Sequence, residues 1–462
     1  MLDSIVTIIH QQNQGYHFSY VDGVSLKEVL YSWGRLTSHH FQTVRPSWME
    51  QAKENWRQID TPVLPYGLGR SYGDSCLLDN GTLLRTDGLD HFISFNPKKG
   101  ILTCEAGVSL ADILRLIIPH GWFLPVTPGT KYVTAGGAVA NDVHGKNHHQ
   151  AGTFGCHVEK IGLIRRDQLG YVECSAHQYR ELYEATIGGL GLTGLILWIT
   201  LKLKKGAPCF DVETIKFFSL DEFYELNHES DQKYEYTVSW VDSCAKGRSL
   251  GRGILMRGNH AKDQNHQNNY SGPIKSKWTL IQPFPHWILN RTTIRLFNEC
   301  YFAKHQNRQL RKNQPFEPFF YPLDSIAHWN LIYGRRGFYQ YQFVIPMDRK
   351  HALKKILTLI SQAQLASFLA VLKVFGTVKS PGMLSFPMPG VTLALDFPNL
   401  GQQTLKLFSM LDDIVLANNG RIYPAKDARM SREAFQLSFP QHHEFSQYMD
   451  HNTLSNFWQR VK

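Results

Sequence analysis

The sequence predicts an α+β fold that includes a largely antiparallel sheet. Short segments rich in β-branched and aromatic residues recur along the chain and are bounded by turn residues, which is typical of strands. Segments with helical spacing of apolar residues are mixed among them, an order that favours α+β architecture. Of the 462 residues, 43% are hydrophobic, which is enough for two or three domains of about 150 residues with apolar cores.

Residues 62–203 are predicted to form mainly strands. Short strands are expected within TLLRTD (82–87), HFISFN (91–96) and GILTCEAGV (100–108). The clearest helix is SLADILRLIIPHG, where Ser109 and Asp112 have the spacing of a capping box and Pro119 and Gly121 end the helix. The segment LILWITLKLKK (195–205) again predicts a strand.

A change of composition after LKLKKGAPC places a domain boundary near residue 206. Beyond it, strands are predicted within YTVSWVD (236–242), FYQYQFVIP (338–346) and VTLALDFP (391–398), and a helix over 348–373.

The polar stretch 259–277 is predicted to be a mobile loop. Trp278, Phe284 and Trp287 follow it beside basic residues. They fit either a partly buried connector or a lid or interfacial patch that meets an apolar substrate tail.

Charge and cysteine content narrow the functional class. The net charge of +10 favours anionic partners such as phosphates, nucleic acid or acidic lipid headgroups. The seven cysteines are dispersed without a CxxC pair, which indicates reduced thiols rather than a disulfide framework or a zinc site. The sequence shows neither a signal peptide nor a membrane span. We therefore expect a cytoplasmic protein, with peripheral contact at the inner membrane face left open.

The stretch IGGLGLTG contains Gly189-x-Gly191-x-x-Gly194, the spacing of a dinucleotide-binding fingerprint. A strand follows these glycines instead of preceding them, which argues against a Rossmann site. Two further glycine-rich stretches, at 65–74 and 125–155, belong to the same predicted domain. Backbone amides in such loops form nests for anions, so the three stretches together predict an extended nucleotide wrapped by loops.

Longer motifs in these loops carry a family resemblance. HGKNHH (144–149) and YPAKD (423–427) are the specific signals, supported by GLGRSYGD (67–74), SWGR (32–35) and SFPMPG (385–390). The chain resembles the vanillyl-alcohol-oxidase class of FAD-binding oxidoreductases over nearly its whole length. Within this class it is most similar to the decaprenylphosphoryl-β-D-ribose 2-oxidases, the flavin half of an epimerase that makes lipid-linked arabinose for cell wall arabinan.

The resemblance implies a two-part fold. An FAD-binding domain would combine residues 1–206 and 421–462, and a substrate-binding domain built on the antiparallel sheet would comprise residues 207–420. Residues 189–194 would then form a turn into a strand packed along the FAD. The residues expected to line the FAD are Pro65, Tyr66, Gly67, Leu68, Gly69, Arg70, Ser71, Tyr72, Gly73, Asp74, Ser75, Gly129, Thr134, Ala135, Gly136, Gly137, Asn141, Asp142, Val143, His144, Ile196 and Tyr423.

Three positions depart from patterns of the class. Many relatives attach FAD through a histidine in a Gly-x-Gly-His-Ser pattern, and Arg70 occupies that position here, so we expect non-covalent FAD. Where the mycobacterial form of this oxidase carries a cysteine, this chain has Ala394, so inhibitors that capture that thiol should fail. The neighbouring Thr392 also differs, which leaves the substrate less certain than the flavin.

The resemblance also brings Lys146, Lys373 and Lys426 together near the isoalloxazine and the substrate. Close cationic neighbours lower each other's pKa, so one lysine can act as a base while another stays charged. Lys426 is expected to be the essential substrate-contacting lysine and the candidate base. Lys146 and Lys373 are expected to bind the sugar or its phosphate, and we count Lys146 and His144 with Lys426 as catalytic candidates.

Polar residues other than lysine complete the predicted pocket. Alternation within FYQYQF places Gln340 and Gln342 on one strand face, where two amides suit sugar hydroxyls, although a solvent-facing strand fits the pattern equally well. Tyr72 and Trp240 are weaker candidates. A metal cluster of His144, His148 and His149 has no matching carboxylate or cysteine, so no metal is expected.

The predicted activity is FAD-dependent oxidation of a secondary hydroxyl, C2 of ribose, in a polyprenyl-phosphate-linked pentose. A separate NADH-dependent short-chain reductase would reduce the 2-keto product and complete the epimerisation. The alternative in the same class is a soluble alditol or aldose oxidase. A nucleic-acid-binding protein would instead require clustered basic residues with stacking aromatics, and the charges here are dispersed.

Overall fold

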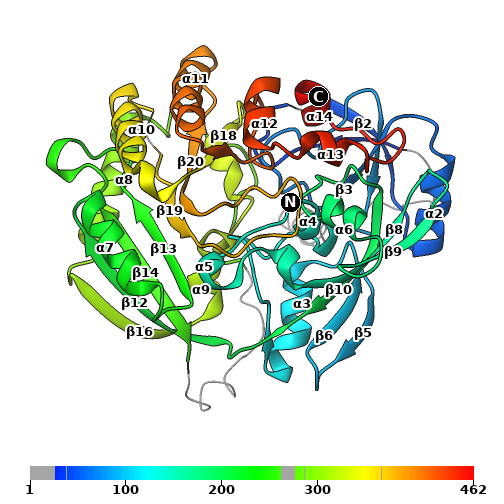
Figure 1. Cartoon of the computed structure of the whole chain (residues 1–462). Helices are drawn as coiled ribbons and strands as arrows, with labels where there is room; N and C mark the ends of the chain where they lie inside the picture. The colour runs from blue at the N-terminus through cyan, green and yellow to red at the C-terminus, as the bar shows by residue number, and fades with distance from the viewer. Residues whose placement is uncertain (1–25, 38, 262–275, 286, 366) are drawn as a thin grey trace, which may run out of the picture.

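The computed structural model describes residues 26–37, 39–261, 276–285, 287–365 and 367–462. Two halves lie side by side, one built from the blue and cyan segments and the other from the green to orange segments (Figure 1). Helices and mostly antiparallel sheets alternate irregularly along the chain. The α+β prediction is therefore confirmed.

The first half contains two main sheets. A four-stranded sheet has the order β1 (Leu26–Leu30), β2 (His39–Val44), β4 (Thr82–Arg85), β3 (Val63–Tyr66), and pairs β4 in parallel with both β2 and β3. A five-stranded antiparallel sheet has the order β5 (Phe92–Asn96), β6 (Ile101–Glu105), β10 (Leu195–Lys202), β8 (Val158–Ile164), β9 (Tyr171–Cys174). A short pair joins β7 (Trp122–Phe123) to β11 (Lys204–Lys205). The helices of this half are α2 (Met49–Gln58), α3 (Leu110–Ile117), α4 (Ala135–Ala140), α5 (His148–Ala151) and α6 (Arg180–Thr186).

Helix α3 begins and ends where the sequence predicts. The Ser109 hydroxyl accepts a hydrogen bond from the Asp112 backbone N–H and donates one of 2.6 Å to the Asp112 carboxylate. The reciprocal bond thus goes to the serine hydroxyl and not to its backbone N–H, which distinguishes this cap from a full capping box. A single 3₁₀ turn follows, and Gly121 ends it with a φ of 74°, a left-handed conformation that favours glycine.

The second half is built on one eight-stranded antiparallel sheet. Its order is β16 (Gln309–Pro315), β12 (Cys209–Phe217), β14 (Gly253–His260), β13 (Tyr236–Val241), β19 (Ala370–Phe375), β20 (Gly390–Pro398), β18 (Phe338–Ile345), β21 (Arg421–Ile422). The predicted largely antiparallel sheet is confirmed, and it extends just past residue 420 because β21 pairs with β18.

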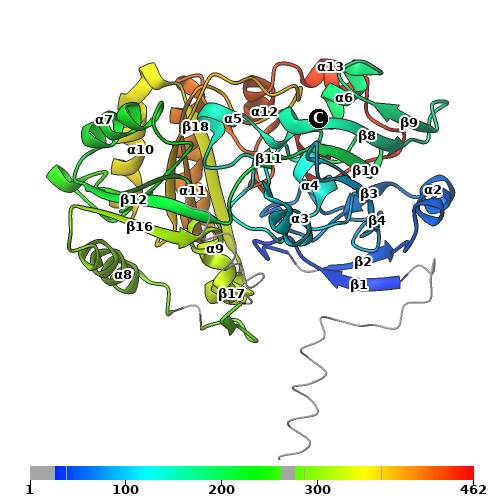
Figure 2. The same cartoon turned by 90° about the horizontal axis from the view of Figure 1, so that it is seen from below.

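Helices cover the outer face of this sheet, as Figure 2 shows from below. They are α7 (Leu220–Ser230), α10 (Lys350–Ala363) and α11 (Gln402–Ala417). Their buried apolar side chains share one core with alternate strand residues such as Phe343 and Leu372. Because side chains alternate along a strand, their neighbours Gln342 and Lys373 point to the opposite face, toward the first half.

The helix predicted over 348–373 is too long. Helix α10 stops at Ala363, and Gln364 follows with a φ of 61° in the left-handed region. Residues 370–375 form β19 instead, with Ala370 and Leu372 buried in the core between the sheet and the helices. Burial alternates from Ala370 to Lys373, as it does in a strand, so the helical spacing of the preceding residues does not continue into this segment.

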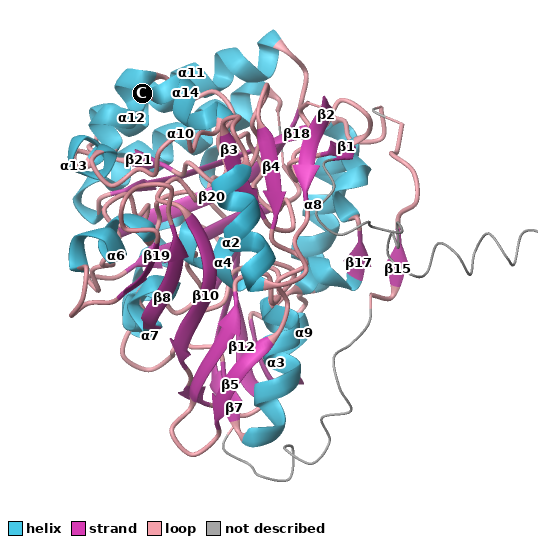
Figure 3. Ribbon diagram, turned by 90° about the vertical axis from the view of Figure 1, so that its right-hand side faces the viewer, coloured by secondary structure: helices cyan, strands magenta, loops and turns pink. Residues whose placement is uncertain are grey.

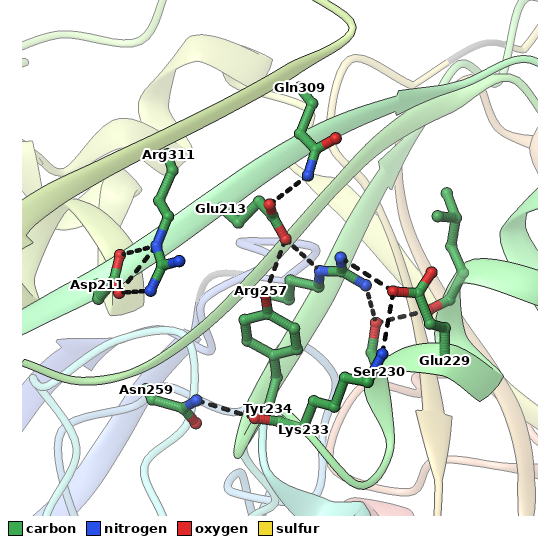
Figure 4. Close-up of polar contacts among 11 residues, drawn as sticks. Asp211, Glu213, Glu229, Ser230, Lys233, Tyr234, Arg257, Asn259, Gln309 and Arg311 are labelled. Carbon is green, nitrogen blue, oxygen red and sulfur yellow. Dashed lines mark hydrogen bonds and ion pairs between the residues drawn. The ribbon is translucent and has the colours of Figure 1, made fainter.

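A polar cluster fixes the register of β12, β14 and β16 (Figure 4). Glu213 lies opposite Arg257 in the β12–β14 pairing and accepts a 2.6 Å hydrogen bond from its Nε. The same carboxylate accepts a 2.9 Å bond from the Tyr234 hydroxyl and a further bond from Gln309 on β16. A one-residue slip would move all these groups to the wrong face, so the cluster specifies the strand pairing.

The C-terminal segment returns to the first half. It forms α12 (Arg432–Ser438), α13 (His442–Ser446) and α14 (Asn456–Val461), which lie together in red in Figure 1. Arg460 forms ion pairs with Asp74 and Asp427. The C-terminal segment therefore holds the loop at 65–75 in place.

Most of the predicted polar loop, residues 262–275, lies outside the described residues. Directly after it, β15 (Trp278–Thr279) pairs in parallel with β17 (Ile326–Ala327), as Figure 3 shows at one side of the molecule. Helices α8 (Arg291–Lys304) and α9 (Phe316–Phe320) complete this region. No helix in the described part of the chain is long and apolar enough to cross a membrane.

Candidate active site

A cavity of about 900 Å³ lies between the glycine-rich loops of the first half and the inner face of the eight-stranded sheet. The loops contribute Gly67 to Tyr72, Thr127 to Thr130 and most residues between Thr134 and Lys146. The sheet contributes side chains from β13, β14, β18, β19 and β20. The tight turns of the loops need glycine at Gly69, with a φ of 61°, and at Gly191, with a φ of 78°.

The apparent dinucleotide fingerprint is a turn that leads into a strand. Gly191 and Gly194, both with positive φ, directly precede β10, and Ile196 on that strand lines the cavity. No helix begins at these glycines, so the Rossmann geometry is absent from this described segment.

Most of the residues predicted for the cofactor line this cavity. They are Pro65, Gly67, Leu68, Gly69, Arg70, Ser71, Tyr72, Ser75, Gly129, Thr134, Gly136, Gly137, Asn141, Val143, His144, Ile196 and Tyr423. The predicted substrate residues Lys146, Gln340, Gln342, Lys373 and Lys426 line it as well, together with Trp240 and Ala394.

Tyr66 and Ala135 were predicted for the cofactor but do not line the cavity. The Tyr66 hydroxyl donates a 2.8 Å hydrogen bond to the backbone carbonyl of Tyr31, and the ring belongs to the main apolar core. Ala135 is fully buried in the core of the first half. Tyr66 points away from the cavity because successive side chains in a strand face opposite directions, and Ala135, at the start of α4, packs into the core.

Gly73, Asp74 and Asp142 are likewise not lining residues. A Cβ at Gly73 would lie 1.6 Å from the carbonyl oxygen of Asp427, so this glycine permits close approach of the C-terminal segment. Asp74 is held by Arg460. Asp142 is fully buried, where it accepts hydrogen bonds from two serine hydroxyls and a 2.9 Å bond from the backbone N–H of Gly155. The three residues support the loops from behind.

Three lysines meet inside the cavity. Burial lowers the pKa of Lys146 to about 7, with a contribution from Lys373. Burial alone lowers the pKa of Lys373 to about 8. The pKa of Lys426 falls to about 7, again chiefly through burial, and its ammonium lies 3.7 Å from the ring centroid of Tyr72. At neutral pH these groups exchange protons readily, which suits acid–base chemistry.

His144 and Gln342 form the wall between the loops and the sheet. The Gln342 amide lies 3.1 Å from His144 Nε2 and donates a 3.3 Å hydrogen bond to Thr392. Burial and the charge of Lys373 hold the pKa of His144 well below its usual value, so the ring is neutral. The ring packs between Phe375 and other aromatic side chains, and its Nδ1 is buried without a partner.

His148 and His149 do not join His144 in a metal site. His148 packs on Phe375 at 4.5 Å, and His149 Nε2 lies 3.0 Å from the Tyr234 carbonyl oxygen. Nowhere in the described residues do three His, Cys, Asp or Glu side chains gather in a way that fits a metal ion.

Arg70 connects the first loop to the far side of the cavity. Its Nε donates a 2.9 Å hydrogen bond to the Tyr132 carbonyl, and its guanidinium stacks on Trp33 at 4.0 Å. Asp324 lies close enough to raise the pKa of Arg70, opposing the effect of burial. Asp324 in turn accepts hydrogen bonds from Thr130 and from the backbone of residue 131. Arg70 is thus an internal support, with a side chain that cannot bond covalently to flavin.

Sequence reasoning missed Asp396. This side chain is fully buried in β20 and accepts a 2.5 Å hydrogen bond from Gln340. Burial raises its pKa to about 7, and the charge of Lys426 opposes that rise. A lone acidic residue in the apolar strand VTLALDFP is a usable signal, because buried carboxylates are rare unless they are paired.

Comparisons with known proteins agree with this geometry. Residues 42–167 match the family model of an FAD-binding domain. The chain is 36% identical to decaprenylphosphoryl-β-D-ribose oxidase of Mycolicibacterium smegmatis over 385 aligned residues. The alignment covers 82% of this chain and 83% of the relative. The chain belongs to this oxidase family.

Two other proteins are more distantly similar to this chain. An uncharacterized protein of Streptomyces coelicolor is 29% identical over 346 residues, covering 72% of this chain and 92% of that protein. The L-gulonolactone oxidase of Bos taurus is 28% identical over 220 residues, covering 46% and 48% of the two chains. As a member of the oxidase family, the protein is an FAD-dependent oxidoreductase.

The cavity fits FAD. Its glycine-rich wall exposes backbone, and a Cβ at Gly129 would meet nothing within 4 Å. Ser75 Oγ and His144 Nδ1 line the cavity and are buried without hydrogen-bond partners, so each is available to a polar cofactor. The loops at 67–75 and 129–144 would hold the nucleotide and its phosphates through backbone N–H groups.

Proposed function

We propose that this oxidoreductase oxidises a secondary hydroxyl, C2 of a ribose that is linked through phosphate to a polyprenyl chain. The meeting of Lys146, Lys373 and Lys426 with Gln340 and Gln342 in one cavity carries the proposal. Cationic groups suit the phosphate, and amides suit the sugar hydroxyls. The similarity to decaprenylphosphoryl-β-D-ribose oxidase supports this substrate class.

Each side chain has a separate task in this proposal. When bound, FAD supplies the two-electron acceptor for the hydride from the carbinol carbon. Lys426, with its pKa lowered to about 7, takes the hydroxyl proton in its neutral form. Lys146 and Lys373 bind the phosphate or sugar, and His144 stays neutral and positions the substrate with Gln342.

The proposal divides the chain as the sequence predicts. Residues 1–206 and 421–462 would form the FAD-binding domain, and residues 207–420 the inserted substrate-binding domain. FAD would bind without a covalent bond, since Arg70 occupies the place of the attachment histidine. Acid precipitation of the pure protein should therefore leave the flavin in the supernatant, and flavin retained in the pellet would contradict this.

An apolar surface beside the cavity fits the lipid part of the substrate. We define the mouth surface as the exposed side chains of Trp278, Ile281, Trp287, Leu296 and Phe297. The backbone N–H of Leu280 bonds to the carbonyl of Ala327, a cavity-lining residue, which places this segment at the cavity edge. Contact with a membrane surface at this edge would present a polyprenyl tail to the site. A separate NADH-dependent reductase would then reduce the keto sugar.

One experiment separates the proposal from its alternative. The holoprotein is mixed anaerobically with polyprenylphosphoryl ribose or with free alditols and aldoses, and bleaching of the flavin absorbance is followed. Reduction by the lipid-linked sugar alone supports the proposal. Equal reduction by free sugars would favour an alditol or aldose oxidase, for which the similarity to L-gulonolactone oxidase is the supporting observation.

A further inference from the structure

Asp396 and Gln340 form a buried pair behind the substrate wall. The two residues lie directly opposite each other in the β18–β20 ladder, so their side chains share the sheet face that looks toward the cavity. Gln340 reaches the cavity and Asp396 does not line it. Gln340 Nε2 donates a 2.5 Å hydrogen bond to one carboxylate oxygen, and the Tyr333 hydroxyl donates a 3.2 Å bond to the other.

Neutral donors alone do not account for a carboxylate at this depth. Asp396 is 0% exposed, and an isolated charge removed from water is strongly unfavourable. Lys426 is the positive charge that acts on it, and the effect is mutual, because Asp396 opposes the fall in the pKa of Lys426. The two opposite charges therefore stabilise each other across the pocket wall.

The surroundings of Lys426 leave Asp396 as its counterion. Lys373 on β19 is a like charge that lowers the pKa of Lys426. Tyr72, in the first loop, presents its ring to the ammonium, and the burial of this tyrosine raises its pKa well above 10, so its hydroxyl is neutral. His144 is neutral as well, because burial lowers its pKa. Lys426 thus faces one carboxylate, one competing cation and neutral groups.

We propose that Asp396 is a positioning residue for the oxidation proposed above: its carboxylate fixes the Gln340 amide toward the sugar and supplies the counterion for protonated Lys426. The inference rests on the proposed function. When the neutral Lys426 amine takes the hydroxyl proton, it becomes an ammonium while the hydride leaves the same carbinol for the flavin. In its ionised form, the Asp396 carboxylate stabilises that ammonium through its opposite charge.

The test measures Lys426 directly in the holoenzyme without any sugar. Acetic anhydride in trace amounts acylates only neutral amines, and mass spectrometry of the peptide containing Lys426 gives the labelled fraction at each pH. We expect a midpoint near 7 in the unaltered protein. In Asp396→Asn, which keeps the shape but removes the charge, the midpoint should fall by about one pH unit. Asp396→Glu, which restores the charge, should return it toward the original value.

Two further variants protect the test against misfolding. Gln340→Met leaves Asp396 in place but removes a donor from its carboxylate, so the carboxylate protonates more readily and the Lys426 midpoint should also fall. Asp412→Asn removes a different buried carboxylate, which Arg429 and Tyr341 hold, and should leave the midpoint unchanged. An unchanged midpoint in folded, FAD-loaded Asp396→Asn and Gln340→Met would overturn the inference.

The pH dependence of flavin reduction provides the second readout. With polyprenylphosphoryl ribose, the acidic limb of the rate should move to lower pH in Asp396→Asn by the same amount as the labelling midpoint. If the lipid-linked sugar fails to reduce the flavin of the unaltered protein, the proposed function fails. The labelling midpoints would in that case still report whether Asp396 and Lys426 are coupled, so the two failures are distinguishable.

Discussion

At the scale of single residues, the cavity brings together three lysine amines whose charged form is disfavoured by burial. Burial lowers the pKa of Lys146, Lys373 and Lys426 toward neutrality, so a bound anion changes how many protons they carry. A phosphate group favours the protonated forms and raises their pKa values. The two lysines proposed to bind the phosphate, Lys146 and Lys373, therefore become fully charged only when such an anion enters.

This coupling predicts proton uptake on ligand binding. At pH 8, Lys146 with a pKa of about 7 is mostly neutral and Lys373 with a pKa of about 8 is half protonated. Binding of a short polyprenyl phosphate should therefore take up about one proton, and less at pH 6, where both amines are already charged. Titration calorimetry in buffers of different ionisation enthalpy measures the uptake. Binding without any uptake at pH 8 would show that the phosphate does not contact these lysines.

Removing the candidate base should slow the chemical step far more than it weakens the fold. Lys426→Met keeps the length of the side chain and should reduce the rate of anaerobic flavin reduction by about 10²- to 10⁴-fold, the usual contribution of a general base. Lys379→Met, at an exposed position, is the matched control, and its flavin should be reduced at the same rate as in the unaltered protein. Stopped-flow absorbance gives both rates. Equal rates in the two variants would remove Lys426 from this role.

Sequence motifs located the lysines and glutamines but did not indicate side-chain direction. GLGRSYGD placed eight residues at the cofactor, yet Gly73 and Asp74 face the C-terminal segment. Asp396 escaped notice because Gln340 and Lys426, which give it a role, lie far from it in sequence and approach it only in the fold.

At the scale of elements, local signals were reliable where one residue determined the boundary. Ser109 caps the start of α3, and Gly121 ends the 3₁₀ turn that follows this helix, as predicted. The long helix prediction failed because nothing in the sequence around Gln364 marks a helix end as a glycine would, while the strand that follows depends on pairing with β13 and β20. Such pairing is tertiary information.

The polar cluster on β12, β14 and β16 allows a matched test of buried and exposed ion pairs. Arg257→Met leaves Glu213 buried without its cation and should lower the free energy of unfolding by about 3 kcal/mol. Arg311→Met breaks a neighbouring ion pair with Asp211, in which the arginine side chain is 67% exposed, and should lower the free energy of unfolding far less. Urea denaturation measures both. Equal losses would mean that the burial of Glu213 does not matter.

At the scale of the whole molecule, the apolar mouth surface lies beside the opening of a basic cavity. Its exposed tryptophans accompany the exposed basic residues Arg291 and Arg295 on α8. Apolar insertion combined with basic charge is the usual requirement for reversible binding to anionic bilayers. Trp278 and Trp287 are exposed and Phe284 is half-buried, so the sequence-based choice between a connector and an interfacial patch stays a prediction.

Removing apolar side chains from the mouth surface should separate lipid contact from cofactor binding. The double variant Trp278→Ser and Ile281→Ser should bind vesicles that contain phosphatidylglycerol several-fold more weakly, while its flavin content stays normal. Leu437→Ser, which removes another highly exposed apolar side chain on α12, should bind as the unaltered protein does. Co-sedimentation gives the comparison. Unchanged binding of the double variant would exclude this surface as the point of membrane contact.

The return of the C-terminal segment sets an order of events during synthesis. Tyr423 and Lys426 complete the cavity, and Arg460 locks the early loop that carries Asp74, so the two walls are separated by most of the polypeptide. A ribosome must therefore release almost the entire chain before the yellow cofactor can settle in its final place. Nascent chains that stop before residue 421 should emerge colourless, however well their sheets have formed.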